Sequence, residues 1–444
     1  MRRTPGIGAA VALAAIAGIA LFGRGDRTGA EVAPPTSSRQ AATTAPRDIA
    51  RLVEQFSAAP TTKVVERLEA EARRANASPA TLALLGLGYQ QLFRESGDPT
   101  WLKRAGSALR EGRAGAPSDP VAVTGLAQLA VTQHRFNDGV TLARAALRLD
   151  SASSAARGAL GDALFNLGRY DAARAEYDRL AAAGPSVAAY ARVAFARQLE
   201  GRRLAAIDAM ELALEAGSGI PEQEAWARVQ YGNMLLGVGR LAAAGRAYET
   251  ALDLSPGYVH AEAGLARVDA ARGRYGRSAD RLRLVIERLP SPQYAILLTD
   301  VLRRAGRNQE AAKADRLVDA LEQLLAANGV RTELSTAVHD LDRGIRVGDA
   351  LARARSAYAA APSVGAADAV AWGLYRSGRC DEARPWALKA GRLGTKDALF
   401  AFHRAMIERC LGNGDAARVG FREALRLDPN FSYRWNRVAE RLAA

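Results

Sequence analysis

A pattern that returns every thirty-odd residues constrains the fold of this chain more than any other feature of its sequence. In each copy, a turn with Gly followed by a basic or polar residue precedes a helical run, and a Pro often follows that run. The copies of the turn are Gly168-Arg169-Tyr170, Gly239-Arg240-Leu241, Gly273-Arg274-Tyr275, Gly306-Arg307-Asn308, Gly378-Arg379-Cys380 and Gly412-Asn413-Gly414. A repeat of this length indicates stacked supersecondary units, each too small to bury its own apolar face alone.

The composition favours helices over strands. Hydrophobic residues make up 49% of the 444 residues but aromatic residues only 6%, and most of the apolar mass is Ala and Leu, which suits closely packed helices. Alternating runs of Val, Ile and Thr, the usual signal of strands, are hard to find. The sequence therefore predicts one long all-α solenoid rather than two or three compact domains.

The small and large positions within each unit resemble the tetratricopeptide repeat. In the unit that begins at Ala225, Gly232 falls on the first helix, where a second helix can approach closely, and Tyr248 falls on the second helix. The same unit has Ala244, Ala251 and Pro256; the unit from Ser154 has Leu160, Gly161, Leu164, Ala173, Tyr177 and Pro185; and the unit from Ala398 ends in Phe421, Ala424, Leu425, Leu427, Asp428 and Pro429. The resemblance implies a right-handed α-solenoid of about nine to ten helix-turn-helix units over residues 79–433. A capping helix is expected over 434–444 and an N-terminal helical pair over 47–78, and the register is weakest at 321–346.

The family resemblance also implies a non-catalytic scaffold that binds partners. In such proteins the first helices line a concave groove that holds an extended peptide or a partner's helix. The positions expected to face the groove here are Asp162, Phe165, Asn166, Phe195, Trp226, Asn233, Arg267, Asp300, Arg303, Trp372, Tyr375, Arg376 and Phe402. Aromatic and Arg side chains are the types that dominate interface energies. The alternative is that the aromatic members simply pack between helices.

Signals for catalysis, metals or cofactors are close to absent. The four histidines, His134, His260, His339 and His403, lie far apart in sequence, with no pair at metal-ligand spacing. Although His403 and Cys410 could suggest a nucleophile pair, they are seven residues apart along one predicted helix, and we read the pairing as chance. We therefore expect no enzyme activity, no metal ion and no cofactor.

The formal charge of +14 raises the question of nucleic acid as a partner. The Arg residues are scattered along every repeat, and the densest cluster, around Arg272 to Arg283, is diluted by Asp269 and Asp280. No recognised nucleic-acid module accompanies them. The pattern favours solvated helix faces over a nucleic-acid partner.

The first 46 residues are expected to stay outside the solenoid. An apolar run from Ile7 to Phe22 follows Arg2 and Arg3, so residues 1–28 form either a signal-anchor or a cleaved signal peptide, and we favour the anchor. Residues 29–46 are rich in Pro, Ala and Thr and form a disordered tether. The solenoid is then expected to be membrane-anchored and extracytoplasmic, or secreted or periplasmic if the segment is cleaved.

The chain has only two cysteines, and the repeat register places both at the same edge of neighbouring units. Cys380 begins a second helix, and Cys410 lies near the end of the next unit's first helix. Outside the cytoplasm a disulfide between them is chemically reasonable, and two buried free thiols are the alternative.

These features lead to two hypotheses for the function. The first is a non-enzymatic, membrane-tethered or exported scaffold that binds a protein or peptide in its groove. The second is an accessory or regulatory subunit of an envelope enzyme, or of a secretion or polysaccharide system.

Overall fold

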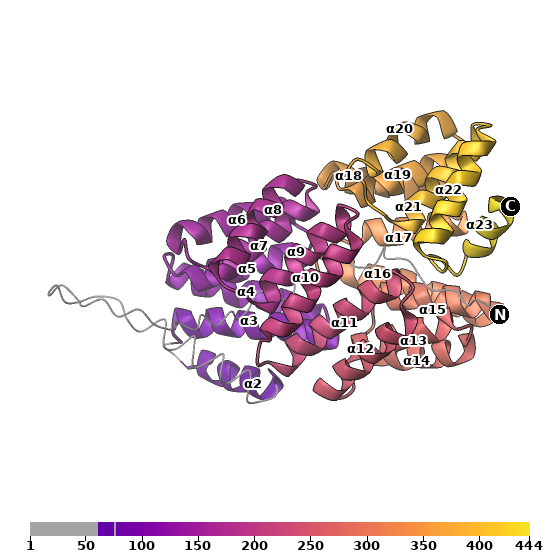
Figure 1. Cartoon of the computed structure of the whole chain (residues 1–444). Helices are drawn as coiled ribbons and strands as arrows, with labels where there is room; N and C mark the ends of the chain where they lie inside the picture. The colour runs from indigo at the N-terminus through magenta and orange to yellow at the C-terminus, as the bar shows by residue number, and fades with distance from the viewer. Residues whose placement is uncertain (1–60, 75–76) are drawn as a thin grey trace.

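The computed structural model describes residues 61–74 and 77–444, and every regular element in these ranges is a helix (Figure 1). The elements are α2 (Thr61–Ala72), α3 (Pro79–Ser96), α4 (Thr100–Gly115), α5 (Pro120–Thr132), α6 (Phe136–Leu149), α7 (Ser154–Asn166), α8 (Tyr170–Ala183), α9 (Val187–Leu199), α10 (Arg203–Ala216), α11 (Pro221–Gly237), α12 (Leu241–Leu254), α13 (Val259–Ala271), α14 (Tyr275–Arg288), α15 (Pro292–Arg304), α16 (Asn308–Ala327), α17 (Glu333–Arg343), α18 (Val347–Ala360), α19 (Val364–Arg376), α20 (Cys380–Ala390), α21 (Ala398–Cys410), α22 (Gly414–Leu427) and α23 (Asn436–Ala443). From α3 to α22 they form ten consecutive helix pairs. The predicted all-α solenoid of stacked pairs is confirmed.

The Gly-Arg turn of the repeat ends the first helix in most units, such as α7, α11 and α13. Gly168, Gly239 and Gly273 have φ angles of 70°, 79° and 76°, a left-handed conformation that favours Gly. The following Arg then donates its backbone N–H to a carbonyl five residues earlier, as Arg169 does to Leu164 at 2.9 Å. This hydrogen bond satisfies a carbonyl that the end of a helix would otherwise leave without a donor. The second helix begins directly after the turn and so runs back along the first.

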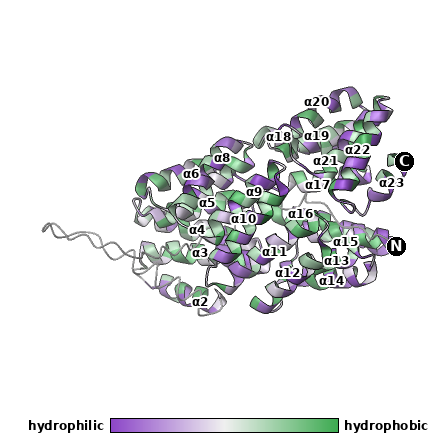
Figure 2. Ribbon diagram, viewed as in Figure 1, coloured by the Kyte–Doolittle hydropathy of each residue, from purple (hydrophilic) through white to green (hydrophobic). Residues whose placement is uncertain are grey.

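Close packing inside a unit depends on a Gly of the first helix. A Cβ added at Gly161 would lie 2.5 Å from the Tyr177 ring, and one at Gly232 would lie 2.6 Å from the Tyr248 ring. Both Tyr side chains are buried. The close approach of a second helix, which the sequence predicts at Gly232, is therefore present. In Figure 2 hydrophobic and hydrophilic residues alternate around most helices, as expected for helices with one buried face.

The array curves with its first helices on the inside. For most neighbouring units the first helices contact each other more extensively than the second helices do. In a curved stack, the inner row of helices is the one whose members lie closer together. The first helices α3, α5, α7, α9, α11, α13, α15, α17, α19 and α21 therefore form the concave surface of a superhelix.

Successive turns of this superhelix touch along one edge. The His134 ring hydrogen-bonds the carbonyl of Arg331, the Tyr170 hydroxyl accepts from the N–H of Val364 at 2.9 Å, and Thr395 donates to the carbonyl of Leu199 at 2.6 Å. The partners are 197, 194 and 196 residues apart. With a repeat of about 34 residues, the offset of 194 residues corresponds to about 5.7 units per superhelical turn. Successive superhelical turns therefore lie side by side, and Figure 1 shows α18 beside α8.

We call this line of contacts the seam. On one side it comprises the intra-unit turns at residues 97, 134, 168–170 and 199–201. On the other side it comprises the junctions between units at residues 289–290, 329–331, 362–364 and 394–396.

The predicted boundaries can be compared with the structure only from residue 61 onward. The predicted anchor and tether, and most of the first helix of the predicted N-terminal pair, lie outside the described residues, whereas α2 lies within that pair. The cap predicted at 434–444 coincides with α23. The region of weak register contains the C-terminal end of α16, a second helix of 20 residues against the 14 typical of the others. Within residues 61–74 and 77–444, no helix combines the length and the hydrophobicity that a membrane span requires.

Candidate functional site

The predicted groove positions divide into two sets in the structure. Six of the thirteen are buried: Asp162, Phe165, Phe195, Trp226, Trp372 and Phe402. The remaining seven are partly exposed: Asn166, Asn233, Arg267, Asp300, Arg303, Tyr375 and Arg376. All of them lie on first helices, so the chain places them along the same inner row.

The buried aromatic positions are not an exposed groove wall, and here the groove prediction needs correction. Phe195 and Trp226 pack edge to face with centroids 6.2 Å apart, and both contribute to the core between units. Trp372 is fully buried and stacks on His403 at 4.1 Å, while Phe402 stacks on Trp435 at 5.6 Å. Large rings fill the space between neighbouring first helices because the small residues of the repeat leave room there.

Phe165 follows the same correction, and so does the polar residue Asp162. Phe165 is 3% exposed and meets the Tyr170 ring edge to face at 5.4 Å. Asp162 accepts two hydrogen bonds from Arg192, at 2.8 and 2.7 Å, and a third from the Tyr177 hydroxyl at 3.1 Å. Arg192 is 1% exposed and Asp162 2%. This pair ties α7 to α9 and does not face a partner.

Further polar contacts join first helices of neighbouring units in the same manner. Arg267 donates to Asn233 at 2.8 Å, between α13 and α11. The Trp372 indole N–H donates to Asp342 at 2.9 Å, between α19 and α17. The inner row is therefore held unit to unit by side-chain hydrogen bonds as well as by apolar packing.

His403 is a member of this set that the sequence analysis missed. Its Nδ1 lies 2.8 Å from an Asp368 carboxylate oxygen, between α21 and α19, and the His side chain is fully buried. Burial disfavours the charged imidazolium, but the charge and hydrogen bond of Asp368, together with the charges of Asp342 and Asp397, outweigh it and raise the pKa of His403. The separation of 35 residues, one repeat, was the signal that could have paired them.

A group of charged side chains faces the interior where α15 meets the C-terminal units. Burial and, next, the charge of Asp342 raise the pKa of Asp300 to about 6. Arg303 forms an ion pair with Asp315, and Arg434 donates to the carbonyl of Asp342 at 2.8 Å. The structure thus brings two of the predicted groove positions together with the segment before α23.

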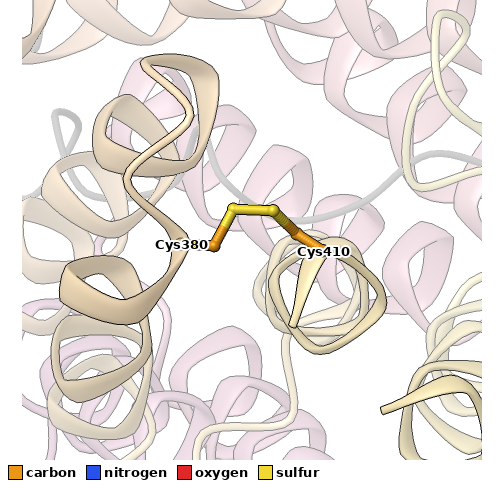
Figure 3. Close-up of a disulfide and its surroundings, with 2 residues drawn as sticks. All are labelled: Cys380 and Cys410. Atoms are coloured by element: carbon orange, nitrogen blue, oxygen red, sulfur yellow. A yellow bond between two sulfur atoms is a disulfide. The ribbon is translucent and has the colours of Figure 1, made fainter. Parts of the chain in front are cut away.

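The two cysteines form a disulfide that joins neighbouring units. It connects the start of α20 to the end of α21, with a Cα–Cα distance of 6.2 Å (Figure 3). Cys380 is buried and Cys410 is exposed. Both lie at the edge of the array where the intra-unit turns are found, which is where the register places them.

No metal site marks the described part of the inner row. Among the described residues no three His, Cys, Asp or Glu side chains are arranged to hold a metal ion. Two shallow hollows lie elsewhere. One of about 420 Å³ includes Pro385, Leu388 and Leu411, and one of about 230 Å³ lies between α4, α5 and the end of α16.

Comparisons with known proteins point to one repeat family. Residues 124–188 and 235–301 match two family models, each described as tetratricopeptide repeat. No curated protein sequence gives a significant match. Solved structures that the chain matches include human IFIT1 in a dimer with PPP-AAAA, at 16% identity and a TM-score of 0.42, covering 79% of this chain and 72% of that one.

Two further solved structures have lower TM-scores. The APC/C hetero-tetramer Cut9-Hcn1 shares 13% identity at a TM-score of 0.34, covering 88% of this chain and 94% of the other. YrrB, a TPR protein with an unusual peptide-binding site, shares 18% identity at a TM-score of 0.28, covering 42% of this chain and 95% of the other.

Proposed function

The chain is a tetratricopeptide repeat protein, and on that premise we propose that it is a non-enzymatic scaffold that holds an extended protein segment against its inner row of first helices. Repeats of this family support protein interaction as a general role. The more specific part of the proposal is the surface used and the setting in which it is used.

The observation that carries the proposal is the run of partly exposed polar and aromatic side chains along the concave surface. Asn166, Asn233, Arg303 and Tyr375 stand on α7, α11, α15 and α19. They are spread over much of the array, so an extended segment could contact several of them at once. Side chains of these types form the hydrogen bonds and stacking contacts that fix a peptide in register.

Sequence features support a setting outside the cytoplasm. Residues 1–28 have the pattern of a signal-anchor, and residues 29–46 that of a tether. A disulfide between Cys380 and Cys410 fits an oxidising compartment, where such bonds persist. We propose accordingly that the scaffold is membrane-tethered or exported.

Affinity capture with the full-length protein from membrane and envelope extracts tests this proposal. The variant Asn166→Arg places a long cation on the inner row, and Val419→Arg places the same cation on the outer surface of α22, where Val419 is 61% exposed. We expect one dominant protein partner with the wild type and with Val419→Arg, and its loss with Asn166→Arg. If the dominant partner is an enzyme or a secretion complex, the activity of that complex should be measured with and without this chain.

Two results would contradict the proposal. Equal capture by both variants would mean that the inner row is not the binding surface. Recovery of only acidic proteins and nucleic acid, released by modest salt, would mean that the net positive charge is what binds.

A further inference from the structure

The repeated turn of the array exists in two tertiary settings. A Cβ added at Gly168 would lie 2.4 Å from the Pro362 carbonyl oxygen, and one at Gly201 would lie 2.3 Å from the Gly394 carbonyl oxygen. At Gly239 and Gly273 nothing lies within 4 Å of such an atom. All four glycines have φ angles between 70° and 79°, so the backbone is the same and only the contact with the next superhelical turn differs.

The seam closes the side of the superhelix. The turns of α3 to α10 contact the junctions about one superhelical turn later, so successive turns of the array touch once in each unit along this stretch. The first helices α7 and α9 lie on the inner side of these contacts. An extended partner that approaches from the side therefore meets the seam before it meets the concave surface.

The middle of the seam is polar, unlike the packing between neighbouring units. Arg392 donates to the carbonyls of Gly168 and Pro362 at 3.4 and 3.3 Å, and Thr395 donates to that of Leu199. Carbonyls at helix ends and the side chains that reach them can exchange these hydrogen bonds for water, so parting them costs little. The core between units, by contrast, is built from buried Ala, Leu and aromatic side chains.

The stretch of the seam between α7–α10 and the C-terminal units has an apolar contact at each end. Val330 is 7% exposed and packs into the core cluster of α2 to α5. Tyr433, after α22, packs into the cluster of α13 to α16, and its hydroxyl donates to the carbonyl of Arg267 at 3.3 Å. The junction at residues 329–331 thus forms a fixed end. The far end is held by the inserted Tyr433 side chain and by Arg203, which donates to the carbonyl of Leu427 at 2.9 Å.

We propose that the seam is a gate to the concave surface. The C-terminal units from α18 to α23 part from α7 to α10 around the fixed end at Val330, with release of Tyr433, and only then does a partner reach α7 and α9 from the side. This inference rests on the proposed function, since it concerns access to the same surface.

The test measures the gate without any partner. The only two cysteines of the chain are joined in the disulfide, so Asn166→Cys introduces a unique thiol on the inner row. Its alkylation is followed with N-ethylmaleimide and with a bulky polyethylene glycol maleimide. The Asn166→Cys substitution is made in three proteins: the otherwise wild-type chain, Gly201→Ala and Gly239→Ala. Gly239→Ala is the matched control, because its added Cβ causes the same backbone strain as at Gly201 but contacts no other part of the chain.

A second readout reports the seam itself. The N–H of Val364 is at the start of α19 and donates to the Tyr170 hydroxyl across the seam. We expect Gly201→Ala to speed hydrogen exchange at Val364 and bulky-probe labelling by about tenfold or more, while Gly239→Ala changes neither. Tyr433→Ser should speed labelling and exchange as Gly201→Ala does. Tyr433→Ser could also disturb α23, which follows shortly after Tyr433. Gly201→Ala lies far from α23 in the sequence and therefore serves as the independent test.

The labelling and exchange rates together support or overturn the proposed gate. Bulky-probe labelling that is as fast in the wild type as in Gly201→Ala overturns the gate, and so does faster exchange at Val364 without faster labelling. The gate is supported if labelling and exchange are faster in Gly201→Ala than in both the wild type and Gly239→Ala. An opened variant that still captures no partner would count against the proposed function and leave the gate standing.

Discussion

Removing one member of the buried Asp162–Arg192 pair should destabilise the array far more than removing both. Both side chains are nearly inaccessible to water, and two hydrogen bonds of 2.7 and 2.8 Å join them. In Arg192→Met the carboxylate keeps only the Tyr177 hydroxyl. A buried charge left without its partner costs about 3–5 kcal/mol. Asp162→Leu should cost about the same, because it leaves the guanidinium buried.

The double variant is expected to recover most of this loss. With both charges gone, the remaining penalty is the Tyr177 hydroxyl without an acceptor, about 1–3 kcal/mol. Simple addition of the two single losses would give about 6–10 kcal/mol. Since burial raises the pKa of Asp162, the carboxyl left alone in Arg192→Met can take up a proton. The cost of Arg192→Met should therefore be smaller at pH 5 than at pH 8.

The assay must resolve local stability, because repeat arrays need not unfold in one step. Urea unfolding followed by circular dichroism should be combined with hydrogen exchange of peptides from α7 to α9. Arg174→Met is the matched control, because the Arg174 side chain is 50% exposed while it pairs with Asp171 at 3.0 Å and with Glu200 at 3.1 Å. Its cost should stay below about 1 kcal/mol. A double variant as unstable as the sum of the singles, or an Arg192→Met loss as small as the control, would refute the reasoning.

Three further predictions concern pH, the disulfide and the close helix contacts. Because the pKa of Asp300 is raised from 3.8 to about 6 in the folded chain, its ionisation works against folding: stability should fall as the pH rises from about 4 to 6, and Asp300→Asn should flatten this dependence in thermal unfolding. Alkylation of the oxidised, unfolded protein should detect no thiol. The double variant Cys380→Ser with Cys410→Ser should lower the free energy of unfolding of the C-terminal units by about 3.6 kcal/mol, as measured by urea unfolding. This magnitude is the chain-entropy value for a 30-residue loop. Gly264→Ala, whose Cβ would lie 2.4 Å from a Tyr ring, should cost about 1–3 kcal/mol by overpacking, whereas Gly245→Ala, with nothing within 4 Å, should stabilise its helix by up to about 1 kcal/mol; equal melting temperatures for the two would contradict the packing argument.

The candidate site was predicted only in part, and the reason lies in the period of the repeat. The register correctly assigns Asp162, Phe195 and Trp372 to first helices, because position within a unit determines the helix on which a residue falls. The register does not determine how deeply the side chain is buried. Whether such a residue faces the groove or fills the space between two first helices depends on the curvature of the array and on the size of the side chain opposite it. Thus Arg192, one unit further along the chain, is what buries Asp162.

The sequence by itself determined the helix pairs, their turns and their order, because these depend on contacts within about one repeat. It also determined which edge carries Cys380 and Cys410. Only the tertiary structure decided that Gly168 and Gly201 lie against the next superhelical turn while Gly239 and Gly273 do not. Small rotations between neighbouring units add up over nearly 200 residues to set the pitch, and no local pattern encodes that sum. The closure of the superhelix, and with it access to the concave surface, follows from that pitch.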